Sequence, residues 1–240
     1  MEQFIFGIEN RARNSEGDDI ITIDGNEHFH LARVLRLKVG EKIFATDGIG
    51  TTCLCIVRRI EKGKSICEVI EEYHNLNSSL RECCIGLSVL KPISKLEFAI
   101  EKCTELGASR LVLFNSERSK KASLRSDRLK SIVISAVKQS LQSKIPELAI
   151  EKDLENVASQ SYVYEEKFVL HEKSNDMVND YLLGLKKSSS VIALVGPEGG
   201  FSDAEVDFLI GKGFKSFSVG KSRLKSETAA IKIASLLAVY

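Results

Sequence analysis

The sequence has no long hydrophobic segment, no cysteine pair at C-x-x-C spacing and no strong excess of either charge. No apolar run approaches the roughly 20 residues that a membrane-spanning helix needs, so we expect no membrane contact. The N-terminus lacks a basic region ahead of an apolar stretch, so we expect no signal peptide. A hydrophobic content of 43% is enough for a core, in one large domain or two smaller ones.

The cysteines are not grouped with histidines at the spacing of a zinc site. We therefore interpret them as reduced core residues of a cytoplasmic protein and predict that the chain binds no metal. The six positions are Cys53, Cys55, Cys67, Cys83, Cys84 and Cys103.

Charge is unevenly distributed although the net charge is only +1. Residues 1–75 hold 10 Lys/Arg and 13 Asp/Glu, a net of −3, and residues 76–240 hold 24 and 20, a net of +4. Residues 117–144 contain eight Lys/Arg against Glu117 and Asp127, a local net charge of +6. Such a segment is typical of a phosphate-binding face and equally of a solvated helix surface.

The first third of the chain reads as short strands separated by turn signals, which is typical of a small antiparallel β-barrel. Asn26 is placed to cap a short helix between the second and third strands. We expect that helix to bury Phe29, Leu31, Val34 and Leu35 and to leave His30, Arg33 and Arg36 nearer solvent. The predicted strands are 4–8, 19–23, 41–47, 51–60 and 65–72.

From residue 84 onward, predicted strands alternate with predicted helices, which indicates an α/β domain with a mostly parallel sheet and helices on both faces. The polar segment 73–82 lies between the two patterns, so we predict domains at 1–74 and 75–240. The strands are 84–90, 110–114, 167–171, 191–195 and 214–219. The first predicted helix begins at Ser94, with a Ser94/Glu97 capping box, and ends at Gly107. Ser202 and Glu205, three residues apart, indicate another helix start. The other predicted helices span 126–143, 176–186, 203–212 and 226–239.

Unusual loops follow three of these strands, and parallel strands would bring the loops to one edge of the sheet. They begin at Leu170-His171-Glu172, at Gly196-Pro-Glu-Gly-Gly200 and at Val219. The glycines match neither G-x-G-x-x-G nor a P-loop, but they allow close approach of backbone to a flat heterocycle. A tight strand-to-helix turn without a ligand explains the same pattern.

Individual polar residues in these loops also leave two interpretations open. Glu198 and Glu227 would face a cationic ligand or stabilise a helix N-terminus, and capping or a surface role is the safer interpretation of Glu227. Ser226 and Thr228 stand where hydroxyls commonly cap a helix. A lone His171 after an apolar strand is more often structural than catalytic.

Five segments, in order along essentially the whole chain, resemble the RsmE family of 16S ribosomal RNA (uracil N3) methyltransferases in the SPOUT superfamily. They are HFHLARVLRLKVGEKIFATDGIG (28–50), KLEFAIEKCTELGASRLVLFNSERS (95–119), AVKQSLQSKIPEL (136–148), GPEGGFSDAEV (196–206) and VGKSRLKSETAA (219–230). The resemblance implies a PUA-like RNA-binding barrel followed by a SPOUT domain with a C-terminal trefoil knot. It also implies S-adenosyl-L-methionine as cofactor, a homodimer, and 16S rRNA in the small ribosomal subunit as substrate.

The resemblance assigns roles to particular residues. The cofactor would be held by Leu170, His171, Gly196, Glu198, Gly200, Val219, Gly220, Leu224, Ser226 and Thr228. Arg118 and Arg223 would hold phosphate or the uracil anion, and Glu198 would act as base or face the sulfonium. The RNA contacts would be His30, Arg33, Arg36, Arg118 and Gln139.

The sequence departs from the family pattern at several of these positions. Ser222 and Arg223 replace Arg-Ile, Lys225 replaces Arg, Ser226 replaces Thr, and Gln142 stands where Arg is usual. Lysine keeps the charge of arginine but loses its planar fork, and Arg223 restores a guanidinium one position along. We expect activity to be retained. The alternatives are an RNA- or ribosome-binding module with a decayed cofactor site, and a SPOUT methyltransferase acting on another RNA.

Overall fold

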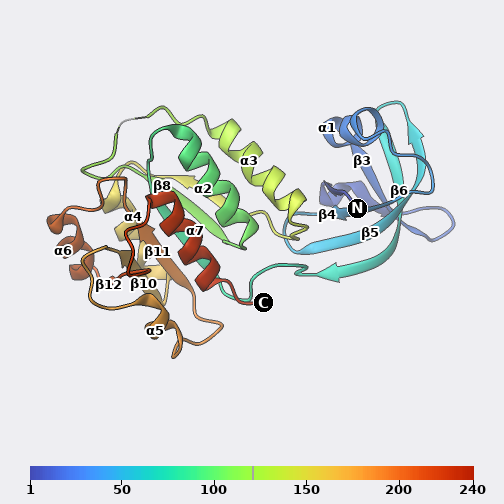
Figure 1. Cartoon of the computed structure of the whole chain (residues 1–240). Coiled ribbons are helices and arrows are strands. Elements are labelled where there is room, and N and C mark those ends of the chain that lie inside the picture. The colour runs from blue at the N-terminus through green and yellow to red at the C-terminus, as the bar shows by residue number, and fades with distance from the viewer. Residues whose placement is uncertain (121) are drawn as a thin grey trace. The chain divides into compact units, whose positions relative to one another are not determined.

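The computed structural model describes residues 1–120 and 122–240, so Lys121 of the basic segment lies outside the described residues. The chain forms two compact units, each with its own six-stranded sheet (Figure 1). One unit comprises Met1–Ser78 with Val137–Ile145, and the other comprises Ser79–Ala136 with Pro146–Tyr240. The assignment of domains to 1–74 and 75–240 stays a prediction.

The sheet of the N-terminal unit has the order β1-β4-β5-β6-β3-β2. Its neighbours are antiparallel except β1 and β4, which are parallel, so the expectation of a wholly antiparallel sheet is wrong at that edge. The predicted first strand ends early, at a 3₁₀ turn, and β2 was not expected. The strands are β1 (Gln3–Ile5), β2 (Arg11–Arg13), β3 (Asp19–Asp24), β4 (Lys42–Thr46), β5 (Thr51–Glu61) and β6 (Lys64–His74).

The short helix of this unit differs from the prediction. Helix α1 (Gly25–Phe29) follows Asp24 at its N-cap rather than Asn26, and it continues as a π-helical turn over His30–Val34. Phe29 and Val34 are 59% and 56% exposed, so the expectation that they are buried is wrong. The buried residues are Leu31 and His28, whose ring Nδ1 lies 2.9 Å from the Ser65 hydroxyl. The prediction of buried positions assumed the residue spacing of an α-helix, and a π-helical turn has more residues per turn.

The segment Val137–Ile145, which begins in the last turn of helix α3 (Ser126–Gln139), belongs to the N-terminal unit. The Gln3 side-chain amide donates to the Gln142 carbonyl at 2.7 Å, and the Thr46 hydroxyl donates to the Ser143 carbonyl at 3.1 Å. Gln142 is buried, with 4% exposure. This departure from the usual Arg therefore lies at a packed position of the N-terminal unit.

The C-terminal unit has the order β12-β10-β11-β7-β8-β9 with every neighbouring pair parallel, which confirms the predicted parallel sheet. Strand β9 and helix α4 were not expected. The strands are β7 (Cys83–Ser88), β8 (Arg110–Phe114), β9 (Glu147–Ile150), β10 (Glu166–Leu170), β11 (Val191–Val195) and β12 (Lys215–Phe217). The helices are α2 (Ile93–Glu105), α3 (Ser126–Gln139), α4 (Leu154–Gln160), α5 (Val178–Leu182), α6 (Asp203–Gly211) and α7 (Ser226–Leu237).

Both faces of this sheet are covered. Cys84, Ile192 and Leu194 belong to one core cluster with residues of α4 and α6. Their neighbours along the strands, Ile85 and Ala193, point to the opposite face and are also fully buried. Helix α7 contacts β7 and β11, and α2 packs along α7 (Figure 1). The sheet thus lies between a layer that contains α4 and α6 and a layer that contains α2 and α7, and the carboxyl ends of its strands remain open.

The helix start predicted at Ser202 and Glu205 is confirmed, whereas the capping box predicted for Ser94 and Glu97 is wrong. Ser202 accepts from the Glu205 N–H, and Glu205 accepts from the Ser202 N–H, at the start of α6. Helix α2 instead starts one residue before Ser94, and Glu97 accepts from Arg128 of α3. Helix α2 ends just before Gly107, which has a φ of +82°, as predicted.

All six cysteines are buried and free, which confirms that they are core residues. Burial raises the pKa of the Cys53 thiol to about 11 and that of Cys67 and Cys103 to about 12. In the part of the chain that the structure describes, no helix combines the length and apolar character needed to cross a membrane.

Candidate functional site

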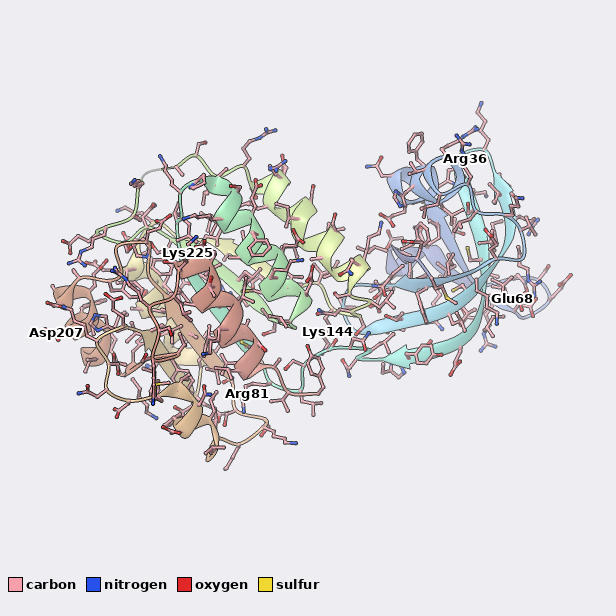
Figure 2. All side chains as sticks on the ribbon, viewed as in Figure 1. Arg36, Glu68, Arg81, Lys144, Asp207 and Lys225 are labelled. Carbon is pink, nitrogen blue, oxygen red and sulfur yellow. The ribbon has the colours of Figure 1, made fainter. Side chains whose placement is uncertain are left out.

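A cavity of about 420 Å³ opens at the carboxyl ends of β10, β11 and β12. Its wall is built from the loops that follow these three strands, together with the first turn of α7 and Arg118 from the loop after β8. Figure 2 shows Lys225 and Arg81 at the two ends of α7. The volume lies in the range of small-molecule sites, which is about 300–1,000 Å³. The prediction that the three loops meet at one edge is therefore confirmed.

Most of the residues predicted to hold a cofactor lie together on this wall. Thr228 is the exception, because it is exposed on the first turn of α7 and does not line the cavity. The three residues predicted to be catalytic, Arg118, Glu198 and Arg223, all line it. The cofactor residues that line it are Leu170, His171, Gly196, Glu198, Gly200, Val219, Gly220, Leu224 and Ser226. Their roles stay predictions.

The loop after β11 is a tight turn in which glycine is required at two positions. A Cβ on Gly196 would lie 3.0 Å from the Phe201 nitrogen and 3.1 Å from the Gly200 carbonyl carbon, which is too close. Gly200 has a φ of +68°, and its N–H donates to the Pro197 carbonyl at 2.9 Å. The loop is thus both a strand-to-helix turn and a wall of bare backbone.

The Arg118 side chain is hydrogen-bonded to the backbone of this loop. Its guanidinium Nη1 donates to the Gly199 carbonyl at 2.9 Å, with the Phe201 carbonyl at 3.4 Å. The neighbouring Glu117 N–H donates to Glu205 at 2.8 Å, at the start of α6. Arg118 therefore has a positioning contact in addition to lying at the cavity, where it remains exposed.

Glu198 is held by the segment after β7. Its Oε1 accepts from the Lys91 N–H at 3.0 Å and lies 3.8 Å from the Lys95 ammonium. The side chain is 37% exposed at the cavity wall. This position gives the cavity one carboxylate whose orientation is set by backbone.

Arg223 and Glu172 form an ion pair between the loops that follow β12 and β10. Arg223 Nε lies 3.1 Å from Glu172 Oε2, and both side chains are more than half exposed. Lys173 pairs similarly with Asp203 at 2.9 Å, and this ammonium holds the pKa of Asp203 below its usual value. Among the described residues, the cavity wall carries four cationic side chains (Arg118, Lys173, Lys221 and Arg223) and two carboxylates (Glu172 and Glu198). This balance suits an anionic substrate at the rim.

The first turn of α7 differs from the prediction of hydroxyl capping. Lys225 occupies the N-cap without a side-chain cap bond, so Ser226 is the first residue of the helix rather than its cap. Glu227 is only 9% exposed, so a surface role is wrong. Its carboxylate Oε1 lies 3.9 Å from the Lys95 ammonium.

The residues predicted to contact RNA through the barrel lie in the N-terminal unit, and so does Gln139. Arg33, Arg36 and Gln139 are exposed, and the His30 ring packs edge-on against Phe4 with centroids 6.1 Å apart. Arg36 has a left-handed φ of +55°.

Sequence reasoning missed several residues at the cavity. Glu172, Lys173 and Lys221 are adjacent to predicted positions, so their place in the three loops could have indicated that they lie at the cavity. Nothing in the sequence indicated that Lys91 and Lys95 contact Glu198, because about a hundred residues separate them from it.

Comparison with known proteins agrees with this architecture. The family model of the RNA methyltransferase domain matches residues 77–238, and that of the RNA methyltransferase PUA domain matches residues 16–70. A protein of Aquifex aeolicus named ribosomal RNA small subunit methyltransferase E is 33% identical, over 92% of this chain and 94% of its own length. A Bacillus subtilis protein of the same name is 28% identical, over 93% of this chain and 91% of its own length.

A solved structure has the same fold. It is the ribosomal RNA small subunit methyltransferase E of Neisseria gonorrhoeae bound to S-adenosyl methionine, which superposes with a TM-score of 0.82 at 24% identity. The match covers 98% of this chain and 95% of that one. Together with the domain matches and the Aquifex relative, the parallel sheet and its three-loop cavity place the chain in the ribosomal RNA small subunit methyltransferase E family.

Proposed function

We propose that the protein transfers a methyl group from S-adenosyl-L-methionine to N3 of a single uridine in the decoding region of 16S rRNA. The observation that carries the proposal is the cavity at the carboxyl ends of β10, β11 and β12, walled by glycine backbone and basic side chains. Family membership supports the substrate class, because the relatives are named for methylation of small-subunit ribosomal RNA.

The cavity fits the cofactor in size and in the nature of its wall. Its volume of about 420 Å³ lies in the range of small-molecule sites, and the glycine turn after β11 forms part of its wall. The backbone of the three loops would hold the adenosine, through residues near Leu170, Gly196 and Val219. The bound cofactor would supply an electrophilic methyl group on a sulfonium.

The side chains at the cavity then have two tasks. Uracil N3 carries a weakly acidic proton that must leave before the nitrogen reacts as a nucleophile. Arg118 and Arg223 would hold phosphate or the negative charge on the base. Glu198 would either take the proton or face the sulfonium, and both roles suit a carboxylate fixed at the wall. Alignment of the two reactants supplies the remaining acceleration.

The N-terminal unit would bind the RNA away from the reacting base. Phosphate contacts position a protein on nucleic acid, and Arg33 and Arg36 are exposed cations suited to them. His30 and Gln139 would add hydrogen bonds. Charge reversal at Arg33 should then weaken binding of RNA without affecting binding of the cofactor.

Assembly and location complete the proposal. The family resemblance implies a homodimer and a trefoil knot in the C-terminal segment, and sedimentation at micromolar concentration tests the dimer. Cytoplasmic location agrees with six buried, free thiols and with a ribosomal substrate.

Transfer of label tests the proposed activity. Purified protein is incubated with methyl-labelled S-adenosyl-L-methionine and either small ribosomal subunits that lack the modification or tRNA, while calorimetry measures binding of the cofactor. We expect label in the subunits and none in tRNA. Cofactor binding with label only in tRNA would indicate another RNA substrate. Neither cofactor binding nor label would indicate a binding module with a decayed site.

A further inference from the structure

A buried carboxylate lies on the first turn of α7, next to Ser226, which lines the cavity. Glu227 is the second residue of α7, and its residue exposure is only 9%. Its Oε2 is buried without a hydrogen-bond partner among the described residues, and its Oε1 lies 3.9 Å from the Lys95 ammonium. Burial of an incompletely bonded carboxylate is costly. The first turn of a helix and a nearby ammonium offset part of that cost.

Lys95 connects this buried carboxylate to the cavity wall. It lies on α2, which packs along α7, and its side chain is 31% exposed. The ammonium is 3.8 Å from Glu198 Oε1 and 3.9 Å from Glu227 Oε1, so the two carboxylates share one cation. Glu198 lines the cavity, whereas Glu227 does not.

The charges of these three side chains do not cancel. Two carboxylates and one ammonium leave a net charge of −1 next to the wall at Glu198. Without Glu227, Lys95 would neutralise Glu198 alone, and this cluster would lose its negative charge. An interaction across several ångströms in a partly buried site is strong enough to change ligand affinity.

We propose that Glu227 is a specificity-determining residue: by offsetting the charge of Lys95, it leaves the charge of Glu198 at the wall uncompensated and thereby favours a cationic sulfonium over a neutral thioether. The inference rests on the proposed function, in which S-adenosyl-L-methionine is the cofactor. Transfer of the methyl group converts the sulfonium into the thioether of S-adenosylhomocysteine, so the same charge favours loading of cofactor over retention of product.

Calorimetry of the full chain with each ligand tests the inference. Glu227→Gln keeps the shape of the side chain and brings the net charge of the cluster to zero. We expect this variant to bind S-adenosyl-L-methionine roughly three- to tenfold more weakly and S-adenosylhomocysteine with unchanged affinity. Lys95→Met makes the cluster more negative, so its preference for the sulfonium should equal or exceed that of the wild type.

The double variant provides the decisive comparison, because it restores a net charge of −1 and should recover a preference close to that of the wild type. Glu97→Gln is the matched control on the same helix as Lys95, away from the cavity wall, and should change neither affinity. Thermal unfolding verifies that each variant is folded.

Two results would overturn the inference and leave the proposed function intact. One is that Glu227→Gln binds both ligands equally more weakly. The other is that the double variant has the same reduced preference for the sulfonium as Glu227→Gln. A wild-type protein that binds neither ligand would overturn both. If Glu227→Gln does not fold, Lys95→Met decides: a loss of preference for the sulfonium in that variant overturns the inference.

Discussion

Arg118 donates from Nη1 to the Gly199 carbonyl at 2.9 Å, so the loop after β8 is attached to the glycine turn after β11. A side chain predicted from sequence to hold an anion thus also shapes the cavity wall. Two parts of the site that are 81 residues apart in the chain are coupled by this bond.

Replacement of Arg118 separates the two tasks. Arg118→Met removes the bond to the loop and the charge, so we expect methyl transfer to fall by roughly a hundredfold or more, as for loss of one stabilising donor. Arg118→Lys keeps the positive charge but lacks the planar guanidinium with its several donors, so it should recover only part of the activity. Rates with a fixed amount of small subunits measure both variants, and equal activity of Arg118→Met and wild type would refute any role for this residue.

Gly200→Val should abolish binding of S-adenosyl-L-methionine while the protein remains folded. The φ of +68° is strained for a side chain branched at Cβ, at a cost of about 1–2 kcal/mol, so the turn must change its backbone. Among the described residues other than Gly200 and its two chain neighbours, no atom lies within 4 Å of the new Cβ, so the fold itself is not obstructed. Calorimetry measures binding, and thermal unfolding measures stability.

Gly211→Ala is the matched control for this substitution. Gly211 ends α6, its Cβ position is equally open among the described residues, and its φ is not left-handed. We expect normal binding in the control. A normal dissociation constant in Gly200→Val would contradict the role of the turn.

The pair between Arg223 and Glu172 predicts opposite effects of two substitutions on RNA affinity. Glu172→Gln frees the guanidinium, so RNA should bind up to about fivefold more tightly, the scale of an exposed ion pair. Arg223→Met should weaken binding and reduce the salt dependence by about one phosphate contact. Filter binding over a series of salt concentrations measures the RNA affinity of both variants. Weaker binding by Glu172→Gln would contradict the prediction that Arg223 leaves Glu172 to contact an RNA phosphate.

Thiol chemistry tests the buried state of the cysteines. Burial raises the pKa of Cys53 to about 11 and that of Cys103 to about 12, so the reactive thiolate is scarce at pH 8. We expect none of the six thiols to react with an aromatic disulfide in the native protein and all six to react in denaturant. Because the unfolded chain loses these protons more readily, stability should fall as the pH rises above about 9. Rapid reaction of a native thiol would contradict this assignment.

The sequence predicted the parts of the fold that depend on local pattern. The apolar run 191–195, the turn signals after it and the helix start at Ser202 and Glu205 all depend on neighbouring residues, and the structure has them as predicted. The Ser94/Glu97 pattern was equally local but failed, because Glu97 bonds to Arg128 on another helix. Phe29 failed because a π-turn altered the helical repeat.

Contacts between distant segments were beyond the reach of pattern reasoning. Nothing near Lys95 in the sequence indicates Glu198 or Glu227, and only the packing of α2 along α7 brings the three together. Val137–Ile145 likewise belongs to the N-terminal unit, where its carbonyls accept hydrogen bonds from Gln3 and Thr46. Residues in the three loops were easier, since parallel strands bring their carboxyl ends to one edge.

The most direct test of the central claim is the chemical position of the transferred methyl group. Small subunits lacking the modification are treated with the protein and S-adenosyl-L-methionine, and the digested 16S RNA is analysed by mass spectrometry. The account predicts one methyl group, on N3 of one uridine in the decoding region. A methyl group on another atom or another base, or unmodified RNA despite measurable binding of the cofactor, would contradict it.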